Sequence, residues 1–512
     1  MKVEKLPYAA LRTHFKPLTL AYLTEFDRLR ACYAVDWRDE KALLERARKV
    51  TPIERETADA VEMHLAALGA PASSLAALAK LRHGAACVVT GQQPGLLGGP
   101  LYNLYKAITA VRLARHIDDR GVPCVAVFWN HADDHNPADL GRLALPDGCL
   151  DVPLEDDGRP VGERAISTDT VGAFQALLPV TPHRRAVDAS LLAASSRRLG
   201  ETFARALLQW LGAQGLVVLE PGHLGPRAAA VLERARREPD LVERAAASAT
   251  QRLRALGFEP PIAGDIGASL FVVRDGRRRR LERSGTALYL DGAAYDGGGR
   301  LSPAVALRPV VQDAALPTAA YVGGPNELAY FAQLGDVYRA FDVPMPAIFP
   351  RASATIIEPR VQRVIEKFAL KGEELFLGRE ALAARVSARA QQGLLDDVSR
   401  VDLAMRERLR GLEGALGVVD KSLIDASRKT AEKASRLFSA FRDRIVESQR
   451  QADQVSGAQI DKLCSHVLPG GAMQERKFTP WYYAAMLGPS FVTDLVEALD
   501  PFAAAHALIR PE

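Results

Sequence analysis

Short apolar runs alternate with helical patterns along most of the chain up to about residue 350. Runs of strand-forming residues occur at 85–90, 122–130, 215–221 and 346–350, and the segment 318–341 has the order strand, Gly-Gly-Pro, helix. The first run leads through a glycine-rich loop into a helical pattern that ends shortly before the second run. A strand, a helix and a strand at this spacing form a βαβ unit, which predicts an α/β fold with a parallel sheet.

The segments between and before these strands have different patterns. Residues 1–80 are mostly helical in pattern, with prolines as breaks, and residues 141–200 are irregular, as in an insertion on the sheet. Residues 271–285 contain Asp275-Gly276 between two short runs. This dipeptide is typical of a tight hairpin turn, so a β-hairpin is predicted there.

Beyond about residue 355, glycine and proline become rare and charged residues become dense. Apolar residues recur there in steps of three and four, which predicts long helices packed as a coiled coil. The stripe consists of Leu394, Val398, Val401, Met405, Leu412, Leu416, Val419, Leu423, Ala426, Leu437, Phe441 and Ile445. Glycines at 411, 414 and 417 predict a turn between two arms. An arm of about forty residues is roughly 60 Å long, and we expect it to bind a partner.

Five segments follow from these shifts in pattern. They are a core with N-terminal helices (1–140), an insertion (141–200), the second part of the core with a small hairpin (201–355), a coiled coil (356–468) and a C-terminal segment packed on the core (469–512). A chain of 512 residues is too long for one ordinary core, so several domains are expected.

Composition narrows the class of protein. The chain is 48% hydrophobic and 25% charged, with a formal net charge of +4, so neither nucleic acid nor an anionic membrane is implied as an obligate partner. Its five cysteines form no CxxC pair, which argues against a disulfide framework or a structural zinc site. The N-terminus lacks the apolar region of a signal peptide, and no apolar run is long enough to span a bilayer. We therefore expect a cytoplasmic protein.

The loop after the first strand is the most unusual stretch of the chain. A glycine-rich turn into a helix exposes backbone N–H groups at the positive end of that helix, which favours a phosphate or carboxylate. Pro100 suits the first helical turn, and Lys106 stands near enough to reach a bound anion. The candidate binding residues are Thr90, Gly91, Gln92, Gln93, Gly98, Gly99, Tyr102 and Lys106.

The loop matches neither the P-loop nor the dinucleotide-binding motif. It is therefore either a ligand-binding loop or a tight connection without a ligand. The adjacent amides of Gln92 and Gln93 favour the first interpretation, because a purely structural turn does not need them.

The second strand ends in the polar segment WNHADDHN, residues 129–136. Ligands of open α/β sheets bind beyond the carboxyl ends of the strands, so this segment should face the glycine-rich loop. Asp133, Asp134 and His135 are the candidate catalytic residues, because a histidine held by carboxylates can act as a base near pH 7. A metal site and a polar loop without a ligand are the competing interpretations. Trp129 and Asn130 are candidate pocket residues.

The later strand–helix unit supplies further candidates. Glu327 stands in the first turn of the predicted helix, where it either interacts with the helix dipole or binds an ammonium group. Arg308 is either a clamp for a carboxylate or the partner of Asp313 in a surface ion pair. Gln312, Gly323, Gly324, Tyr330 and Arg351 complete the candidate set.

Taken together, these motifs resemble the bacillithiol biosynthesis cysteine-adding enzyme family. The resemblance rests on TGQQPGLLGGPLYNLYKAI, FWNHADDHN, YVGGPNELAYF and the tail segment containing Gln-Glu-Arg, and it runs from near the N-terminus to the end of the chain. Asp133 and Asn136 stand where that family usually has Glu and Asp, and Asn326 stands where it often has a small residue.

The resemblance implies a Rossmann-like core related to the nucleotidyltransferase domains of class I aminoacyl-tRNA synthetases. It also implies connecting-peptide-like insertions and a coiled coil that forms a homodimer. The implied reaction joins cysteine to the amine of glucosaminyl malate, forming an amide. His135 would be the base, poised by Asp134, and ATP is a possible activator of cysteine; whether a metal takes part is left open.

Two alternatives stand beside this interpretation. One is a synthetase-like enzyme with another amine acceptor, although the chain contains neither a HIGH nor a KMSKS signature. The other is an inactive coiled-coil scaffold, against which the acid–base cluster argues.

Overall fold

A computed structural model describes residues 1–263 and 266–511, with side chains except at 390–392 and 446–455. The chain divides into two compact units. The core unit consists of residues 1–356 and 472–512, and the helical unit of residues 357–471.

The core unit is built on a parallel sheet of five strands. In spatial order these are β14 (Ala347–Pro350), β13 (Thr318–Gly323), β2 (Ala86–Gln92), β3 (Cys124–Asn130) and β6 (Val217–Leu219). Every neighbouring pair is parallel. The predicted parallel sheet is thus confirmed, and each strand lies within or close to its predicted run.

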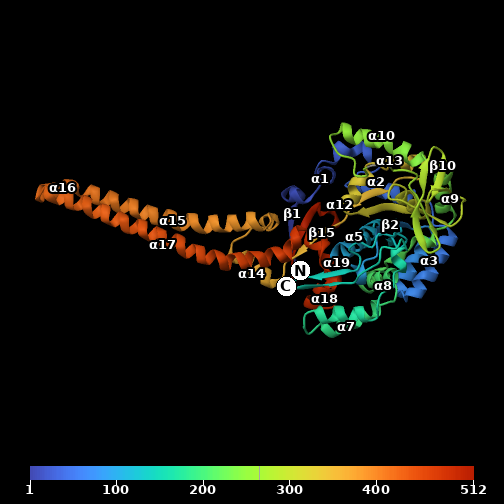
Figure 1. The fold of residues 1–512 in the computed structure, drawn as a ribbon, viewed down its shortest axis with the longest axis horizontal. Helices are drawn as coiled ribbons and strands as arrows, with labels where there is room; N and C mark the ends of the chain where they lie inside the picture. Colours follow the sequence, from blue (N-terminus) through green and yellow to red (C-terminus); the bar gives the residue numbers. More distant parts are fainter. Residues whose placement is uncertain (264–265, 512) are drawn as a thin grey trace. The chain divides into compact units, whose positions relative to one another are not determined.

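Continuous apolar runs, rather than alternating ones, mark these strands because both faces of the sheet are covered. Every residue of β3 is buried, as is every residue of β2 except Gln92. Helix α5 (Leu101–Asp118) packs across β2 and β3, and the sheet lies among helices in Figure 1.

The strand order places a ligand-binding edge. The chain adds β3 and β6 on one side of β2, then returns to add β13 and β14 on the other side. This is the Rossmann order, and its point of reversal lies between β2 and β13. Ligands of such sheets bind in the crevice beyond the carboxyl ends of the strands at that point.

Helices occupy most of the remaining core unit. They are α1 (Pro17–Thr24), α2 (Glu40–Arg48), α3 (Arg55–Leu68), α4 (Ala72–Arg82), α6 (Asp169–Leu177), α7 (Arg184–Ala194), α8 (Leu199–Leu211), α9 (Pro226–Arg237), α10 (Leu241–Ala255), α11 (Arg308–Ala315), α12 (Pro325–Phe331), α13 (Gly335–Ala340), α18 (Pro480–Leu487) and α19 (Phe491–Ala498). No helix among the described residues has both the length and the apolar character needed to cross a bilayer.

Small sheets accompany the main one. The predicted hairpin at 271–285 is confirmed: β7 (Leu270–Arg274) and β8 (Arg277–Arg280) turn at Asp275 and Gly276, both with positive φ. Beside β7 lies β12 (Arg300–Pro303). The other short strands are β4 (Arg142–Leu145), β5 (Gly148–Asp151), β9 (Glu282–Ser284), β10 (Ala287–Leu290) and β11 (Ala293–Ala294).

One three-stranded sheet joins distant parts of the chain. Strand β16 (Ala505–Arg510) pairs antiparallel with β1 (Lys2–Pro7) and parallel with β15 (Ser353–Ile356). The segment 1–80 was expected to be mostly helical, so β1 is a difference from the sequence analysis. The strand that pairs with β1 lies at the other end of the chain, so the sequence around residues 2–7 does not indicate this pairing.

The helical unit contains α14 (Pro359–Lys367), α15 (Arg379–Gly411), α16 (Glu413–Val419) and α17 (Ser422–Val467). Helices α15 and α17 lie side by side, as Figure 1 shows, and α16 lies in the turn between them. The predicted pair of long helices and the turn near the glycines are confirmed. Several apolar residues of these helices remain exposed, among them Leu437 (66%) and Phe441 (54%).

Candidate active site at the carboxyl edge of the sheet

Two adjoining cavities lie at the carboxyl edge of the sheet. The acid–base cavity, of about 440 Å³, is lined by Asp133, Asp134, His135, Arg278 and their neighbours. The cationic cavity, of about 350 Å³, is lined by Gln92, Tyr102, Lys106, Gly324, Pro325, Asn326, Glu327, Arg351 and Arg476. Gln93, His131, Asp134, Val305 and Arg308 line both cavities. The glycine-rich loop and the polar segment after β3 thus face a common space.

Asp134 connects the two segments. Its Oδ2 accepts a hydrogen bond from Gln93 Nε2 at 2.8 Å. Its Oδ1 accepts one from the backbone N–H of His135 at 2.7 Å and lies 3.3 Å from Arg278 Nη1. The carboxylate therefore holds the loop after β2, the end of β3 and the hairpin strand β8 in one arrangement.

His135 has a different partner from the predicted one. Arg278 Nη1 lies 3.0 Å from His135 Nδ1, whereas Asp134 Oδ1 is 3.5 Å away. A guanidinium can only donate hydrogen bonds, so Nδ1 must accept and the neutral imidazole carries its proton on Nε2. In this arrangement His135 is a hydrogen-bond donor to the cavity. The predicted base role requires Arg278 to move away from Nδ1.

Asp133 lies deeper, with 9% of its surface exposed. Its Oδ2 accepts a hydrogen bond from Ser302 at 2.6 Å, and Ser302 accepts one from Arg278 Nε at 3.0 Å. Arg278 also stacks over the ring of Phe271 at 3.8 Å. Burial lowers the pKa of Arg278, and the attraction of the carboxylates opposes this effect.

The ammonium group of Lys106 bonds acceptors within the protein and is therefore not available to bind an anion. Only 2% of its side chain is exposed, and its Nζ lies 2.6 Å from Gly91 O, 3.0 Å from Gln92 Oε1 and 2.5 Å from Glu327 Oε2. An ammonium group has three hydrogens, and these acceptors use all of them. Lys106 thus fixes the wall of the cationic cavity.

Glu327 is equally well held. Its carboxylate accepts hydrogen bonds from Tyr321 at 2.6 Å and from the Gly324 amide at 2.7 Å, besides its contact with Lys106. Burial alone would raise the pKa of this carboxyl, but Lys106 and the other donors outweigh burial and hold the pKa below its ordinary value. The Lys106–Glu327 pair therefore joins α5 to α12 across the end of the sheet.

Three arginines give the cationic cavity its character. Arg308 does not pair with Asp313; its Nη2 lies 3.2 Å from the Tyr330 hydroxyl. Arg351 contacts Glu475 at 2.5 Å, while its buried Nε has no hydrogen-bond partner among the described residues. Arg476 comes from the Gln-Glu-Arg segment of the tail and was not among the predicted site residues. An anion is the ligand that this lining fits.

Several sequence-derived candidates lie outside both cavities. Thr90 Oγ1 bonds Val322 O between β2 and β13, and Asn130 bonds Glu220 and Gly200 O. Trp129 is fully buried, and Tyr330 lines a neighbouring apolar pocket. The other candidates outside are Gly91, Gly98, Gly99, Gln312 and Gly323.

The part of the glycine-rich loop next to α5 uses its amides within the protein. The N–H groups of Gly98 and Gly99 donate to carbonyls of the loop, and that of Leu101 donates to Phe478 O. Pro100 is the residue before α5 rather than part of its first turn. The glycines instead allow close packing, because a Cβ on Gly98 would lie 2.2 Å from the Trp210 ring.

Gly98→Ala should therefore lower the stability of the core unit by about 3 kcal/mol, from a strained φ and an overpacked ring. Gly121→Ala is the matched control, because Gly121 also has a positive φ but no atom near its missing Cβ. Its cost should be only about 1 kcal/mol. Thermal unfolding followed by circular dichroism measures both, and equal losses would contradict the packing role.

Gln312 supports a buried acid rather than a ligand. It donates to Asp313 Oδ1 at 3.0 Å, and Tyr338 donates to Oδ2 at 2.5 Å. Burial raises the pKa of Asp313 to about 6.

Because the pKa of Asp313 is higher in the folded than in the unfolded chain, folding favours the protonated acid. The resulting contribution to the free energy of unfolding is fully present below the unfolded pKa. It is lost as the pH rises through about 6, by up to about 3 kcal/mol. We expect Asp313→Asn to flatten the dependence of the unfolding midpoint on pH between about 4 and 7.5. If the unfolding midpoints of the variant and the parent chain changed equally with pH, Asp313 would not contribute to the pH dependence of stability.

Metal ligands are not gathered in the described part of the chain, where no three His, Cys, Asp or Glu side chains are grouped as a metal site requires.

The core unit is a Rossmann-like α/β unit with polar cavities where its strand order reverses, and the helical unit consists of long paired helices. These features define a class of protein with a Rossmann-like core and a coiled-coil unit. The chain matches the family model described as "Bacillithiol biosynthesis BshC, N-terminal Rossmann-like domain" over residues 1–352. It matches "Bacillithiol biosynthesis BshC, C-terminal coiled-coil domain" over residues 354–511. The chain therefore belongs to the bacillithiol biosynthesis BshC family.

Relatives in three bacteria share most of their length with this chain, and each is named "Putative cysteine ligase BshC". A Thermus thermophilus protein is 34% identical over 88% of this chain and 93% of its own length. The Koribacter versatilis protein is 31% identical over 95% and 96%, and the Salinibacter ruber protein is 30% identical over 99% and 98%.

Proposed function

We propose that the protein is a ligase that forms an amide between cysteine and the amine of glucosaminyl malate. The observation that carries this proposal is a pair of adjoining cavities, one rich in arginine and the other holding Asp133, Asp134 and His135 beside Arg278. The acceptor molecule has the same division, with carboxylates on its malate part and an amine on its sugar. The name of the relatives, cysteine ligase, supports the same reaction.

We propose that the cationic cavity binds the anionic part of a substrate. Arg308 and Arg476 would bind the malate carboxylates or the phosphates of a nucleotide through charge-assisted hydrogen bonds. A carboxylate does not acylate an amine in water without activation, so cysteine needs a co-substrate, and we propose ATP. The buried Lys106–Glu327 pair would keep the wall behind the anion rigid.

The acid–base cavity would then receive the sugar amine. The carboxylates of Asp133 and Asp134 attract an ammonium group, and one of them accepts a proton from it. The free amine would then attack the ATP-activated carboxyl carbon of cysteine and displace the phosphate-containing leaving group. His135, with Nδ1 occupied by Arg278, would donate from Nε2 to an oxygen of the substrate. Gln93 joins the two cavities through its bond to Asp134 and would position the malate relative to the amine.

Mass spectrometry tests this function directly. Purified protein incubated with cysteine, glucosaminyl malate and ATP should yield a product whose mass is the sum of the two substrates less one water. Omitting ATP should abolish the product if ATP is the activator. Absence of product under all nucleotide conditions would contradict the ligase assignment.

We further propose that a second copy of the chain covers the exposed apolar residues of the helical unit. Leu437 and Phe441 are exposed one helical turn apart on α17, and adjoining exposed apolar side chains are typical of an interaction surface. Sustained apolar spacing at three and four residues is typical of coiled coils that associate.

The variant Leu437→Glu/Phe441→Glu should be a monomer at concentrations where the parent chain is a dimer. Light scattering after size-exclusion chromatography measures the mass of each. Glu432→Gln/Arg436→Gln, in an exposed ion pair on the same helix, is the control and should not change the mass. A monomeric parent chain would contradict the proposed dimer.

A further inference from the structure

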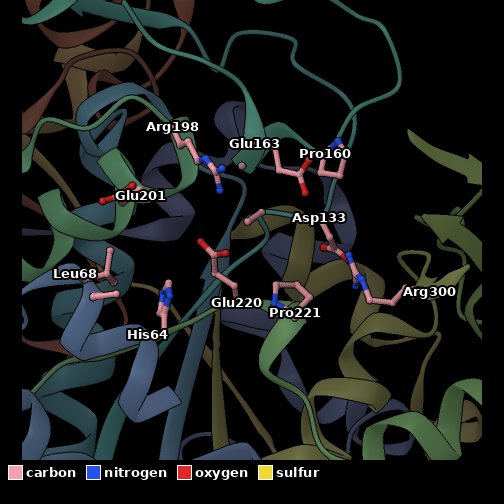
Figure 2. Close-up of a pocket in the computed structure, with 14 residues that line it drawn as sticks. His64, Leu68, Asp133, Pro160, Glu163, Arg198, Glu201, Glu220, Pro221 and Arg300 are labelled. Atoms are coloured by element: carbon pink, nitrogen blue, oxygen red, sulfur yellow. The ribbon is translucent and has the colours of Figure 1, made fainter. Parts of the chain in front are cut away.

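A third cavity, of about 380 Å³, lies beyond the carboxyl ends of β3 and β6. Figure 2 shows that its charged side chains point toward a common space. They are Asp133, Glu163, Arg198, Glu220 and Arg300, with His64 on one side, whereas Glu201 lines the edge of the cavity and pairs with Arg205. The proposed function does not use this cavity beyond Asp133.

The floor of this cavity is acidic. Glu220 directly follows β6 and accepts a hydrogen bond from the buried Asn130 at 2.8 Å. Burial raises the pKa of Glu220 to about 7, so the carboxylate gains from a cation beside it. A Cβ on Gly200 would lie 3.0 Å from Gly162 Cα and 3.3 Å from Glu220 Oε1, so a glycine at 200 leaves space for both the backbone and the carboxylate.

The rim is basic. Arg198 and Arg300 are both exposed, and neither has an ion-pair partner among the described residues. In Figure 2, Arg300 lies beside Asp133 at one end of the cavity, and Arg198 lies across from it near Glu163. A cavity with a carboxylate on its floor and guanidinium groups at its rim matches a molecule that carries both charges.

Asp133 lines this cavity and the acid–base cavity alike. A small molecule whose carboxylate faced Arg300 would therefore present that carboxylate at the entrance to the acid–base cavity. Leu68, Ala67 and Pro221 supply an uncharged wall for a short side chain.

We propose that this cavity is the subsite for a free α-amino acid, whose ammonium group lies against Glu220 and whose carboxylate faces Arg300. The assignment rests on the proposed ligase function in naming that amino acid as cysteine. It places the carboxyl group to be joined at the Asp133 end, beside the cavity proposed for the amine. The three cavities would then hold, in order, the anionic part of the acceptor, its amine and the amino acid.

Two analogues of cysteine separate the contributions of its charges. Cysteamine keeps the ammonium group and lacks the carboxylate, and 3-mercaptopropionate keeps the carboxylate and lacks the ammonium group. Binding of cysteine and both analogues to the full chain is measured by calorimetry under reducing conditions. The variants are Glu220→Gln and Arg300→Gln, and Arg277→Gln, an exposed arginine outside the cavities on β8, is the control.

Glu220→Gln should weaken cysteine and cysteamine by about 10- to 100-fold and leave 3-mercaptopropionate unchanged. Arg300→Gln should weaken cysteine and 3-mercaptopropionate by about 10-fold and leave cysteamine unchanged. Unchanged cysteine binding in both variants, or equal losses for all three compounds, would overturn the subsite. Should Glu220→Gln fail to fold, Arg300→Gln decides alone, because its side chain is on the surface.

The outcomes also separate the subsite from the proposed function. If product forms and the KM for cysteine is unaffected by both variants, the ligase stands and the subsite is wrong. If cysteine binds as predicted and no product forms with any nucleotide, the subsite stands and the ligase assignment is wrong.

Discussion

Asp134→Asn is expected to lower kcat/KM for product formation by about 100-fold or more. Its two oxygens accept from Gln93, the His135 amide and Arg278, and an asparagine replaces one acceptor by an NH₂ group that faces a donor. The loop after β2 and the hairpin strand β8 would then lose their shared anchor, and the acid–base cavity would lose a charge. Steady-state kinetics with saturating ATP measures the effect.

Asp156→Asn is the matched control for this change. It makes the same substitution at an exposed aspartate that lines none of the three cavities. The control should retain kcat/KM within a few-fold. Wild-type kinetics in Asp134→Asn would show that the two cavities do not depend on this carboxylate.

Glu327→Gln is expected to destabilise the core unit by about 3–5 kcal/mol. Removing the carboxylate leaves Lys106, with 2% of its side chain exposed, as an uncompensated buried charge. It also weakens the acceptors that hold Tyr321 and the Gly324 amide. Replacing both charged partners, as in Lys106→Met/Glu327→Leu, should restore much of the loss, because no buried charge is then left unpaired.

Tryptophan fluorescence during denaturant unfolding measures the free energy of unfolding of the core unit. All four tryptophans, at 37, 129, 210 and 481, belong to the core unit, so the signal does not include the helical unit. A double variant less stable than Glu327→Gln would contradict the explanation by an unpaired charge.

Local patterns were sufficient to predict the central sheet. Strands β2 and β3 are continuous apolar runs because both of their faces are buried, and the β7–β8 turn has the dipeptide that its positive φ values require. The rule that ligands bind at carboxyl ends then predicted that Gln93 and His135 face the same space, and both line the acid–base cavity.

The remainder depends on partners that are distant in sequence. Gly98 packs against Trp210 and its N–H bonds Gly95 O, and Lys106 donates to Gly91 O, Gln92 and Glu327, so neither that amide nor the lysine is free for an anion. Arg278 reaches His135 from a hairpin that carried no chemical signal of its own. The only hint of Arg476 was the resemblance of the tail, because no spacing rule brings it to the end of β13.

The central claim is that the cysteine carboxyl carbon becomes bonded to the sugar nitrogen. A reaction with carboxyl-¹³C cysteine and ¹⁵N-labelled glucosaminyl malate tests it, with the product examined by NMR. The account predicts a one-bond ¹³C–¹⁵N coupling in the product, and no such signal in a reaction with Asp134→Asn stopped at the same early time. A product whose labelled carbon shows no coupling to the labelled nitrogen would contradict the account.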